Sequence, residues 1–309
     1  ILDLIGQVVG EGLGGTSATL YASEEVVANS TRTALNGAFS TLTEPPQVLG
    51  IGCTFAVGGQ GPVGETLAEY TPLSFIWSIS ECEACSYAAL GKPHSLVILA
   101  GTGSFVTYCG PEGYRAHVGG GGPTLGDFGS GYWIGVEGLK RAFQSYQEAL
   151  PETTLVQRLC ERFKLPDLGA LVPLVYVTKL SRWEIASLSK LVADEADAGD
   201  NVSRQILTDA AEELNRQLEV VARKLEGEEP PSDVVLAGGV LQRKGLVAAL
   251  VSQRASEVLP QAKVTTLELP PAAGCALSGL ARLGFEVDEL VHQLTLASWR
   301  ALKEDKGSA

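Results

Sequence analysis

The sequence predicts an α/β protein built from two lobes with a cleft between them. A chain of 309 residues is too long for one small core, so a pair of α/β lobes is its natural division. Hydrophobic residues make up 45%, charged ones 19%, and the 36 glycines suit an α/β protein with many tight loops. A pattern of strands separated by glycine turns occurs near residue 1 and again from Ser95, which indicates a duplicated lobe.

The first part of the chain alternates between helical and extended patterns. Residues 1–15 alternate apolar positions on both sides of a Gly6 turn and predict a hairpin. Ser23, followed by two glutamates, opens a helix that continues to about Leu42, before two prolines end it. Short apolar runs predict strands over 48–57 and 73–79, with a helix over 63–70 between them.

The pattern of strands begins again at Ser95. Apolar runs predict strands over 95–100, 105–109 and 115–118, and the turns between them contain glycine. Residues 132–225 are mainly helical, with the clearest amphipathic spacing over 206–225. A buried strand over 232–240, a strand over 263–269 and a last helix from Cys275 complete the prediction.

Charge and hydropathy exclude several classes of partner. The net charge of −13 and the lack of a basic run argue against nucleic acid and against an anionic membrane surface. No stretch approaches the roughly 18 apolar residues of a membrane span, and no signal pattern opens the chain, so we expect a cytoplasmic protein. The sequence contains no methionine, not even at position 1, and we do not expect position 1 to be the start of the gene.

The six cysteines are too scattered for a disulfide framework, and we expect them to be reduced and mostly buried. Cys82 and Cys85 form a CxxC pair. A zinc site needs a second pair of ligands, and the three histidines stand singly. Metal or redox use of this pair is therefore the less favoured alternative.

The segment Gly101-Thr102-Gly103-Ser104 follows an apolar strand and turns tightly into the next one. Its backbone N–H groups and hydroxyls can face an anion without interference from Cβ atoms, as in a phosphate loop. Taken alone, the same four residues also fit a simple hairpin turn.

A glycine run, Gly119 to Gly122, closes the third predicted strand, and Asp127 follows just before a helix. This spacing places backbone amides and one carboxylate at a helix N-terminus, where a polar ligand could bind. The structural alternative is that Asp127 caps the helix, a common role for aspartate.

On these motifs the chain resembles the N-acetylglucosamine kinase-like branch of the BadF/BadG/BcrA/BcrD ATPases, within the superfamily of sugar kinases, actin and heat-shock ATPases. The resemblance covers nearly the whole chain and is sharpest over AGTGS, GGGGPTLGDFGSGYWIG, VLAGGV and PPAAGCALSGL. It implies two ribonuclease-H-like lobes. One covers 1–92 and is truncated at its start, and the other covers 93–309, with a helical insertion and an adenosine-binding motif.

The resemblance also implies an activity: ATP-dependent phosphorylation of a sugar hydroxyl, most simply that of an amino sugar such as N-acetylglucosamine. ATP and Mg²⁺ would be the cofactors, and a sugar 6-phosphate the product. A homodimer is compatible with the resemblance, which decides neither the sugar nor the oligomeric state.

Residue roles follow from the same resemblance. Gly101, Thr102 and Gly103 would bind ATP phosphates, and Ser104 would lie near the sugar. Gly120, Gly121, Gly122 and Asp127 would form the sugar loop, in which the carboxylate accepts hydrogen bonds from hydroxyls. The adenosine side would contain Ala211, Gly238, Gly239, Gly274 and Ser278.

The chain departs from the family pattern at several points. Relatives begin with a strand ending in Asp-Gly-Gly-Gly-Thr, and residue 1 falls just after it, so we expect that the first strand of lobe one is missing through truncation. Relatives also carry Asn at Ala18, Trp at Gly121 and Glu at Phe128, which leaves fewer polar and stacking contacts for an N-acetyl sugar.

The general base is a further departure. The family uses an aspartate near the start of the helix that precedes the second lobe, where this chain reads Ser80-Glu81-Cys82-Glu83. Glu81 or Glu83 could accept the proton, Cys82 could occupy the position instead, and both glutamates could simply favour the helix start.

Two rival functions remain at this point. A non-catalytic sugar or nucleotide sensor would explain the missing aspartate. An electron-transfer activator ATPase would need an iron–sulfur cluster, for which Cys82 and Cys85 stand at the wrong place.

Overall fold

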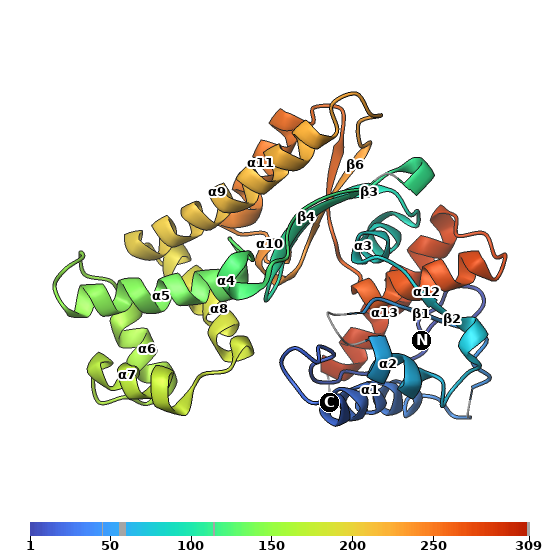
Figure 1. Cartoon of the computed structure of the whole chain (residues 1–309), viewed down its shortest axis with the longest axis horizontal. Helices are drawn as coiled ribbons and strands as arrows, with labels where there is room; N and C mark the ends of the chain where they lie inside the picture. Colours follow the sequence, from blue (N-terminus) through green and yellow to red (C-terminus); the bar gives the residue numbers. More distant parts are fainter. Residues whose placement is uncertain (45, 56–59, 114, 308–309) are drawn as a thin grey trace. The chain divides into compact units, whose positions relative to one another are not determined.

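The computed structural model describes residues 1–44, 46–55, 60–113 and 115–307 (Figure 1). Its contacts divide the chain into two compact units, one of residues 1–94 with 267–309 and the other of residues 95–266. This division differs from the predicted boundaries, 1–92 and 93–309, in where it puts the C-terminal segment. Residues 267–309 join the first unit because helix α12 (Pro271–Arg282) packs on α3 (Glu81–Leu90) and on β1 (Ile51–Cys53).

The first unit is mainly helical around a small parallel sheet. Strand β1 pairs in parallel with β2 (Ile76–Ser78), in the register Ile51 to Ile76. The remaining elements of this unit are α1 (Glu24–Phe39), α2 (Gln60–Leu67), the 3-10 turn η1 (Leu73–Phe75) and α13 (Glu289–Gly307). Helix α13 holds the N-terminal segment, because the Thr295 hydroxyl donates to the Gly6 carbonyl at 2.7 Å.

The second unit contains a mixed sheet of five strands in the order β5-β4-β3-β6-β7. Strand β3 is antiparallel to β4 and parallel to β6, and its side chains are almost entirely buried. The strands are β3 (Ser95–Ala100), β4 (Ser104–Cys109), β5 (Arg115–Gly119), β6 (Asp233–Ala237) and β7 (Lys263–Thr266). The sheet thus has antiparallel pairs on the β4 side of β3 and parallel pairs on the β6 side, the arrangement expected for a ribonuclease-H-like lobe.

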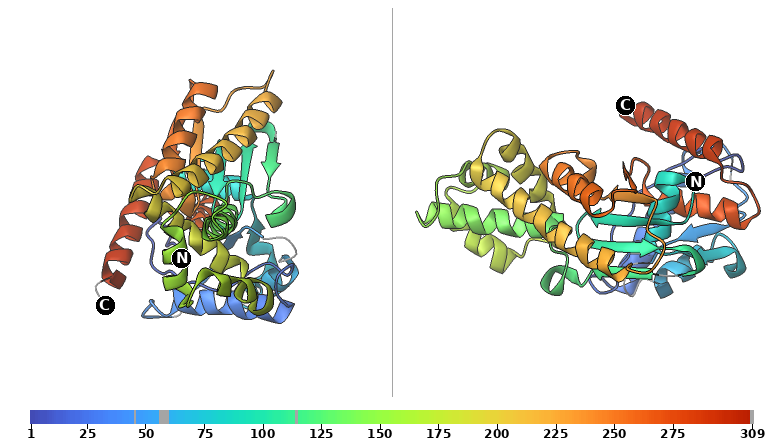
Figure 2. Two further views of the ribbon diagram at one scale, coloured as in Figure 1. Left: turned by 90° about the vertical axis from the view of Figure 1, so that its left-hand side faces the viewer. Right: turned by 90° about the horizontal axis from the view of Figure 1, so that it is seen from above.

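Helices cover this sheet and extend beyond it. Helix α9 packs on β4 and β5 and runs beside α11, as Figures 1 and 2 show, while α5 packs on α8. The longer helices are α5 (Gly131–Tyr146), α6 (Leu155–Phe163), α8 (Arg182–Asp197), α9 (Asn201–Lys224) and α11 (Leu246–Val258). The short ones are η2 (Pro111–Gly113), α4 (Gly122–Leu125), η3 (Leu168–Ala170), α7 (Leu171–Pro173), η4 (Leu174–Thr178) and α10 (Gly239–Gln242).

Several predicted elements differ in length. The hairpin over 1–15 is a single antiparallel bridge between Leu2 and Val8. The strands over 48–57 and 73–79 shorten to the three residues of β1 and β2, and residues 56–57 of the first lie outside the described residues. Because its described sheet has only these two parallel strands, the first unit does not repeat the three-strand pattern of the second.

The C-terminal predictions also need correction. Strand β7 ends at Thr266, and the apolar residues after it, Leu267 and Leu269, are buried without joining the sheet. The last helix begins at Pro271 rather than Cys275, since proline is well tolerated in a first helical turn. A further helix, α13, follows it. None of the helices in the described part of the chain is long and apolar enough to cross a membrane.

Candidate functional site

The predicted phosphate loop is the turn between β3 and β4. The Gly101 N–H donates to the Gly103 carbonyl at 2.9 Å, and the Gly101 carbonyl accepts from the Gly131 N–H at 2.7 Å. Thr102 is exposed at the tip, while Ser104 is buried and its hydroxyl donates to the Phe128 carbonyl at 2.7 Å. The segment is therefore a hairpin turn whose exposed tip can meet an anion.

The predicted sugar loop packs directly on this turn. The Gly120 N–H donates to the Ser104 carbonyl at 2.9 Å. The Asp127 carboxylate accepts from the Ser104 N–H at 3.3 Å, and its other oxygen lies 2.5 Å from Nη2 of Arg182. Asp127 does not cap α5, because Ser130 is the N-cap and its hydroxyl oxygen accepts from the Trp133 N–H at 3.2 Å. The capping alternative for Asp127 is thus wrong.

The first glycine of the predicted adenosine motif borders the phosphate loop. Gly238 has a φ of +86°, and a Cβ there would lie 2.5 Å from the carbonyl carbon and oxygen of Ala100 and 2.7 Å from the Gly101 nitrogen. Only glycine allows the β6 turn to approach β3 this closely. Gly239, in contrast, has open space at its Cβ position. Four predicted motifs therefore meet in the second unit: the phosphate loop, the glycine run, Asp127 and Gly238.

The other predicted adenosine residues belong to other elements. Ala211 lies on α9 and is only 1% exposed, within the hydrophobic core. Gly274 and Ser278 belong to α12 in the first unit. A Cβ at Gly274 would lie 1.8 Å from the Ala84 carbonyl oxygen, so this glycine allows α12 to pack closely on α3.

The two candidate bases occupy different environments at the start of α3. The Glu83 carboxylate accepts from the Ser80 N–H at 3.0 Å and from the Ser80 hydroxyl at 2.7 Å, and it completes a capping box. Within the described residues, the Glu81 carboxylate accepts no such hydrogen bond, and its side chain is exposed. Desolvation by the surrounding protein nevertheless raises the pKa of the Glu81 carboxyl. Glu83 therefore stabilises the helix, while Glu81 remains available to a ligand.

The cysteines are all free thiols. Burial raises the pKa of Cys275 to about 12 and that of Cys53 to about 11, so both thiols are protonated at neutral pH. Cys82 and Cys85 are buried in α3, and no group of three side chains able to hold a metal occurs among the residues that the structure describes.

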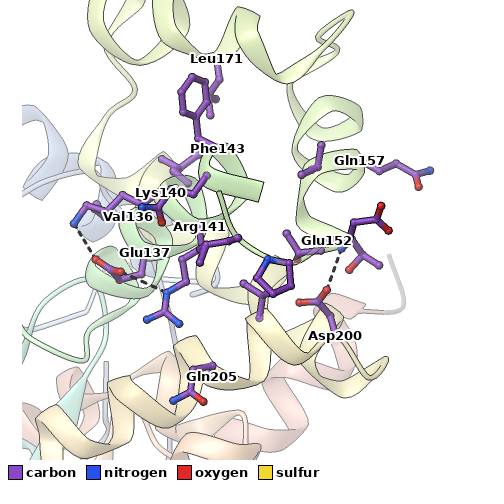
Figure 3. Close-up of a pocket in the computed structure, with 18 of the residues that line it drawn as sticks. Val136, Glu137, Lys140, Arg141, Phe143, Glu152, Gln157, Leu171, Asp200 and Gln205 are labelled. Atoms are coloured by element: carbon purple, nitrogen blue, oxygen red, sulfur yellow. Dashed lines mark hydrogen bonds and ion pairs between the residues drawn. The ribbon is translucent and has the colours of Figure 1, made fainter. Parts of the chain in front are cut away.

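A cavity of about 1750 Å³ lies among the helices α5 to α9 of the second unit (Figure 3). Apolar side chains such as Phe143 and Leu171 line one part, and Glu137 pairs with Lys140 and Arg141 in another. None of the residues predicted from the sequence lines this cavity.

Sequence reasoning missed two residues that hold the Asp127 loop. Arg182 begins α8 and pairs with the Asp127 carboxylate, although 55 residues separate them. Gln217, on α9, donates from Nε2 to the Phe128 carbonyl at 3.0 Å. No local pattern marks either residue, because both contacts depend on how the helices pack.

Similarity to solved structures shows the fold. An enzyme from Chromobacterium violaceum, described as a candidate N-acetylglucosamine kinase, superposes with a TM-score of 0.66 at 21% identity. The alignment covers 88% of this chain and 90% of that one. The likeness establishes the actin-like ATPase fold of the sugar kinases.

The chain belongs to the BadF/BadG/BcrA/BcrD ATPase family, whose model matches residues 1–279. It is 35% identical over 199 residues to N-acetyl-D-glucosamine kinase of Dictyostelium discoideum, which is 64% of this chain and 62% of that protein. It is 28% identical over 199 residues to N-acetylmuramic acid/N-acetylglucosamine kinase of Clostridium acetobutylicum, covering 64% and 65%. The matched region thus spans less than two thirds of each of these relatives.

Proposed function

We propose that this protein transfers the γ-phosphoryl group of ATP to a hydroxyl of an amino sugar, with N-acetylglucosamine as the first candidate. The observation that carries the proposal is the cluster in the second unit, where Asp127 and Gly238 each lie against the β3–β4 turn. The names of the two sequence relatives support the choice of sugar.

In this proposal the tip of the phosphate loop contacts ATP. Thr102 is exposed there, and the backbone of the turn is held by its own hydrogen bonds and by Gly131. Preorganised backbone donors stabilise charge on a phosphoryl group without having to reorganise during the reaction. Ser104, in contrast, is 1% exposed and donates its hydroxyl to the Phe128 carbonyl, so it supports the sugar loop from behind.

Glu81 is the residue that we assign as general base. It is an exposed residue at the first position of α3, and the surrounding protein desolvates its carboxyl group and raises its pKa. A raised pKa makes a carboxylate a better acceptor for a hydroxyl proton near neutral pH. Glu83 is already engaged by Ser80 and is not proposed for this role.

ATP supplies the phosphoryl group, and the exposed turn at Thr102 fits its phosphates, because a Cβ placed on Gly101 would meet no atom within 4 Å. Mg²⁺ commonly keeps several waters and binds through substrate phosphates with one or two carboxylates. It would therefore enter together with ATP. The homodimer and the cytoplasmic location remain predictions.

One observation favours a second candidate function, a sensor that binds sugar or nucleotide without turnover. The Phe128 side chain is 42% exposed beside Asp127, at the position where the family carries glutamate. An apolar ring there offers no hydrogen bond to a sugar, so binding and catalysis could both be weakened.

A coupled assay of ADP release tests the proposal, with N-acetylglucosamine, N-acetylmannosamine, glucosamine, glucose and N-acetylmuramic acid as substrates. We expect turnover with at least one amino sugar. Asp127→Asn should raise KM for that sugar about 10–100-fold, because a hydrogen bond to a charged group is worth about 1.5–3 kcal/mol. ATP binding without ADP release for any sugar would favour the sensor.

A further inference from the structure

Arg182 contacts the carboxylate that the proposed function assigns to the sugar. It is the first residue of α8, whose start is fixed by a capping box between Ser181 and Glu184. Its Nη2 atom lies 2.5 Å from Oδ2 of Asp127. The Asp127 side chain is 5% exposed and that of Arg182 is 28% exposed, so a nearly buried carboxylate has a cationic partner that reaches the surface. A buried carboxylate is costly unless it is paired.

The backbone of the Asp127 loop is held by other groups. Asp127 has a φ of +55°, an uncommon conformation for a residue other than glycine. The Ser104 hydroxyl and the Gln217 amide both donate to the next carbonyl, that of Phe128, at 2.7 and 3.0 Å. Since these neutral contacts fix the main chain, the Arg182 contact acts mainly on the orientation and charge of the carboxylate.

The ion pair also borders the phosphate loop. A Cβ placed on Gly103 would lie 3.0 Å from both carboxylate oxygens of Asp127 and 3.1 Å from Nη2 of Arg182. The ion pair therefore lies directly against the β3–β4 turn. A change in the geometry of the ion pair would alter the place where sugar and phosphate are proposed to meet.

From this geometry we infer that Arg182 is a positioning residue for the sugar. It holds one oxygen of the Asp127 carboxylate while the Ser104 N–H holds the other, so that the remaining lone pairs point in fixed directions toward sugar hydroxyls. Arg182 acts through Asp127 and makes no proposed contact with ATP. The inference rests on the proposed function, because it needs Asp127 to bind the sugar.

The test uses the full chain and four variants: Arg182→Gln, Arg182→Lys, Asp127→Asn and the double variant Asp127→Asn/Arg182→Gln. Arg158→Gln is the matched control, because Arg158 is also an ion-paired arginine of this unit, with Glu161 of its own helix α6 and Glu195 of α8 as its partners. Steady-state rates are measured with N-acetylglucosamine and ATP varied separately.

We expect Arg182→Gln to raise KM for the sugar about tenfold or more, as loss of a charge-assisted contact predicts, with KM for ATP unchanged. Arg182→Lys should recover part of this loss, and the double variant should bind sugar no worse than Asp127→Asn alone. The inference is overturned if Arg182→Gln leaves the sugar KM unchanged, if it raises both KM values equally, or if the double variant shows additive losses.

A separate readout distinguishes failure of this inference from failure of the proposed function. If the wild type phosphorylates no sugar, the proposed function fails, and the same variants are compared by the rise in Tm that N-acetylglucosamine causes without ATP. Loss of that rise in Arg182→Gln but not in Arg158→Gln supports the positioning role. An equal rise in the wild type and Arg182→Gln, or no rise in the wild type, contradicts it.

Discussion

Replacing Gly238 with alanine should disrupt the junction between the adenosine motif and the phosphate loop. The new Cβ would lie 2.5 Å from the Ala100 carbonyl and 2.7 Å from the Gly101 nitrogen, and both are backbone atoms at the end of a buried strand. A real Cβ does not approach a backbone atom this closely, so the β6 turn or the phosphate loop must shift.

The cost has two parts. Gly238 has φ +86° and ψ 153°, a region almost restricted to glycine, where another residue costs about 1–3 kcal/mol. Overpacking adds about 1–3 kcal/mol when a packed interior must move. The expected loss is therefore about 2–6 kcal/mol, a large share of the roughly 5–15 kcal/mol by which domains are stable.

Thermal unfolding with and without ATP measures this effect, and Gly239→Ala is the matched control. Gly239 is the neighbouring residue, has ordinary φ and has no atom within 4 Å of its Cβ position. We expect Gly238→Ala to lower Tm by several degrees and to weaken ATP binding, and the control to leave Tm unchanged. Equal Tm values for the two variants would refute the packing argument.

Three further predictions concern the first unit. Because desolvation raises the pKa of Glu81, kcat/KM should fall with decreasing pH around a midpoint above about 4.3, the ordinary pKa of a glutamate. Glu81→Gln should lower kcat about 10²–10⁴-fold, because the general base is lost. Folded Glu81 holds its proton more tightly than unfolded Glu81, so its contribution to stability declines as pH rises through the folded pKa; Glu81→Gln should remove that decline in urea titrations at several pH values. Glu83→Gln should instead lower stability by up to about 1 kcal/mol through the weakened capping box, with kcat retained. Gly274→Ala should lower Tm because its Cβ would meet the Ala84 carbonyl at 1.8 Å, whereas Gly279→Ala, with no contact shorter than 3.7 Å, should not.

The sequence predicted the elements whose signals are local. Helix α1 begins where Ser23 caps it, and its hydroxyl oxygen accepts from the Val26 N–H. Strands β3, β4 and β6 were found because each is a mainly apolar run in the interior of the sheet, with turns at both ends. The tight turn over 101–104 was predicted for the same reason, since two glycines between such strands favour a close reversal of the chain.

The elements that sequence reasoning placed poorly depend on tertiary contacts. The apolar residues of 48–57 and 263–269 resemble longer strands, but Leu267 and Leu269 are buried outside the sheet. The same limit applies to the site. A helix cap was the structural alternative for Asp127, yet the cap is Ser130, three residues later, and the Asp127 carboxylate pairs with Arg182 of α8.

One glycine of the predicted adenosine motif lies where the prediction places it, and another has a packing role instead. Gly238 was assigned to adenosine binding from its motif, and its backbone does lie against the phosphate loop. Gly274 was assigned to the same side, and its close approach to Ala84 gives it a packing role that no sequence pattern distinguishes from ligand binding. A glycine motif thus predicts that another group comes close to the backbone, but it does not distinguish a bound ligand from a packed helix.

The most direct test of the proposed function is to identify the product formed from N-acetylglucosamine and ATP by phosphorus NMR. We expect a new phosphate monoester resonance on the sugar, formed in equal amount with ADP and absent in Glu81→Gln. ATP that stays intact, or that yields only ADP and free phosphate, would contradict the assignment as a sugar kinase.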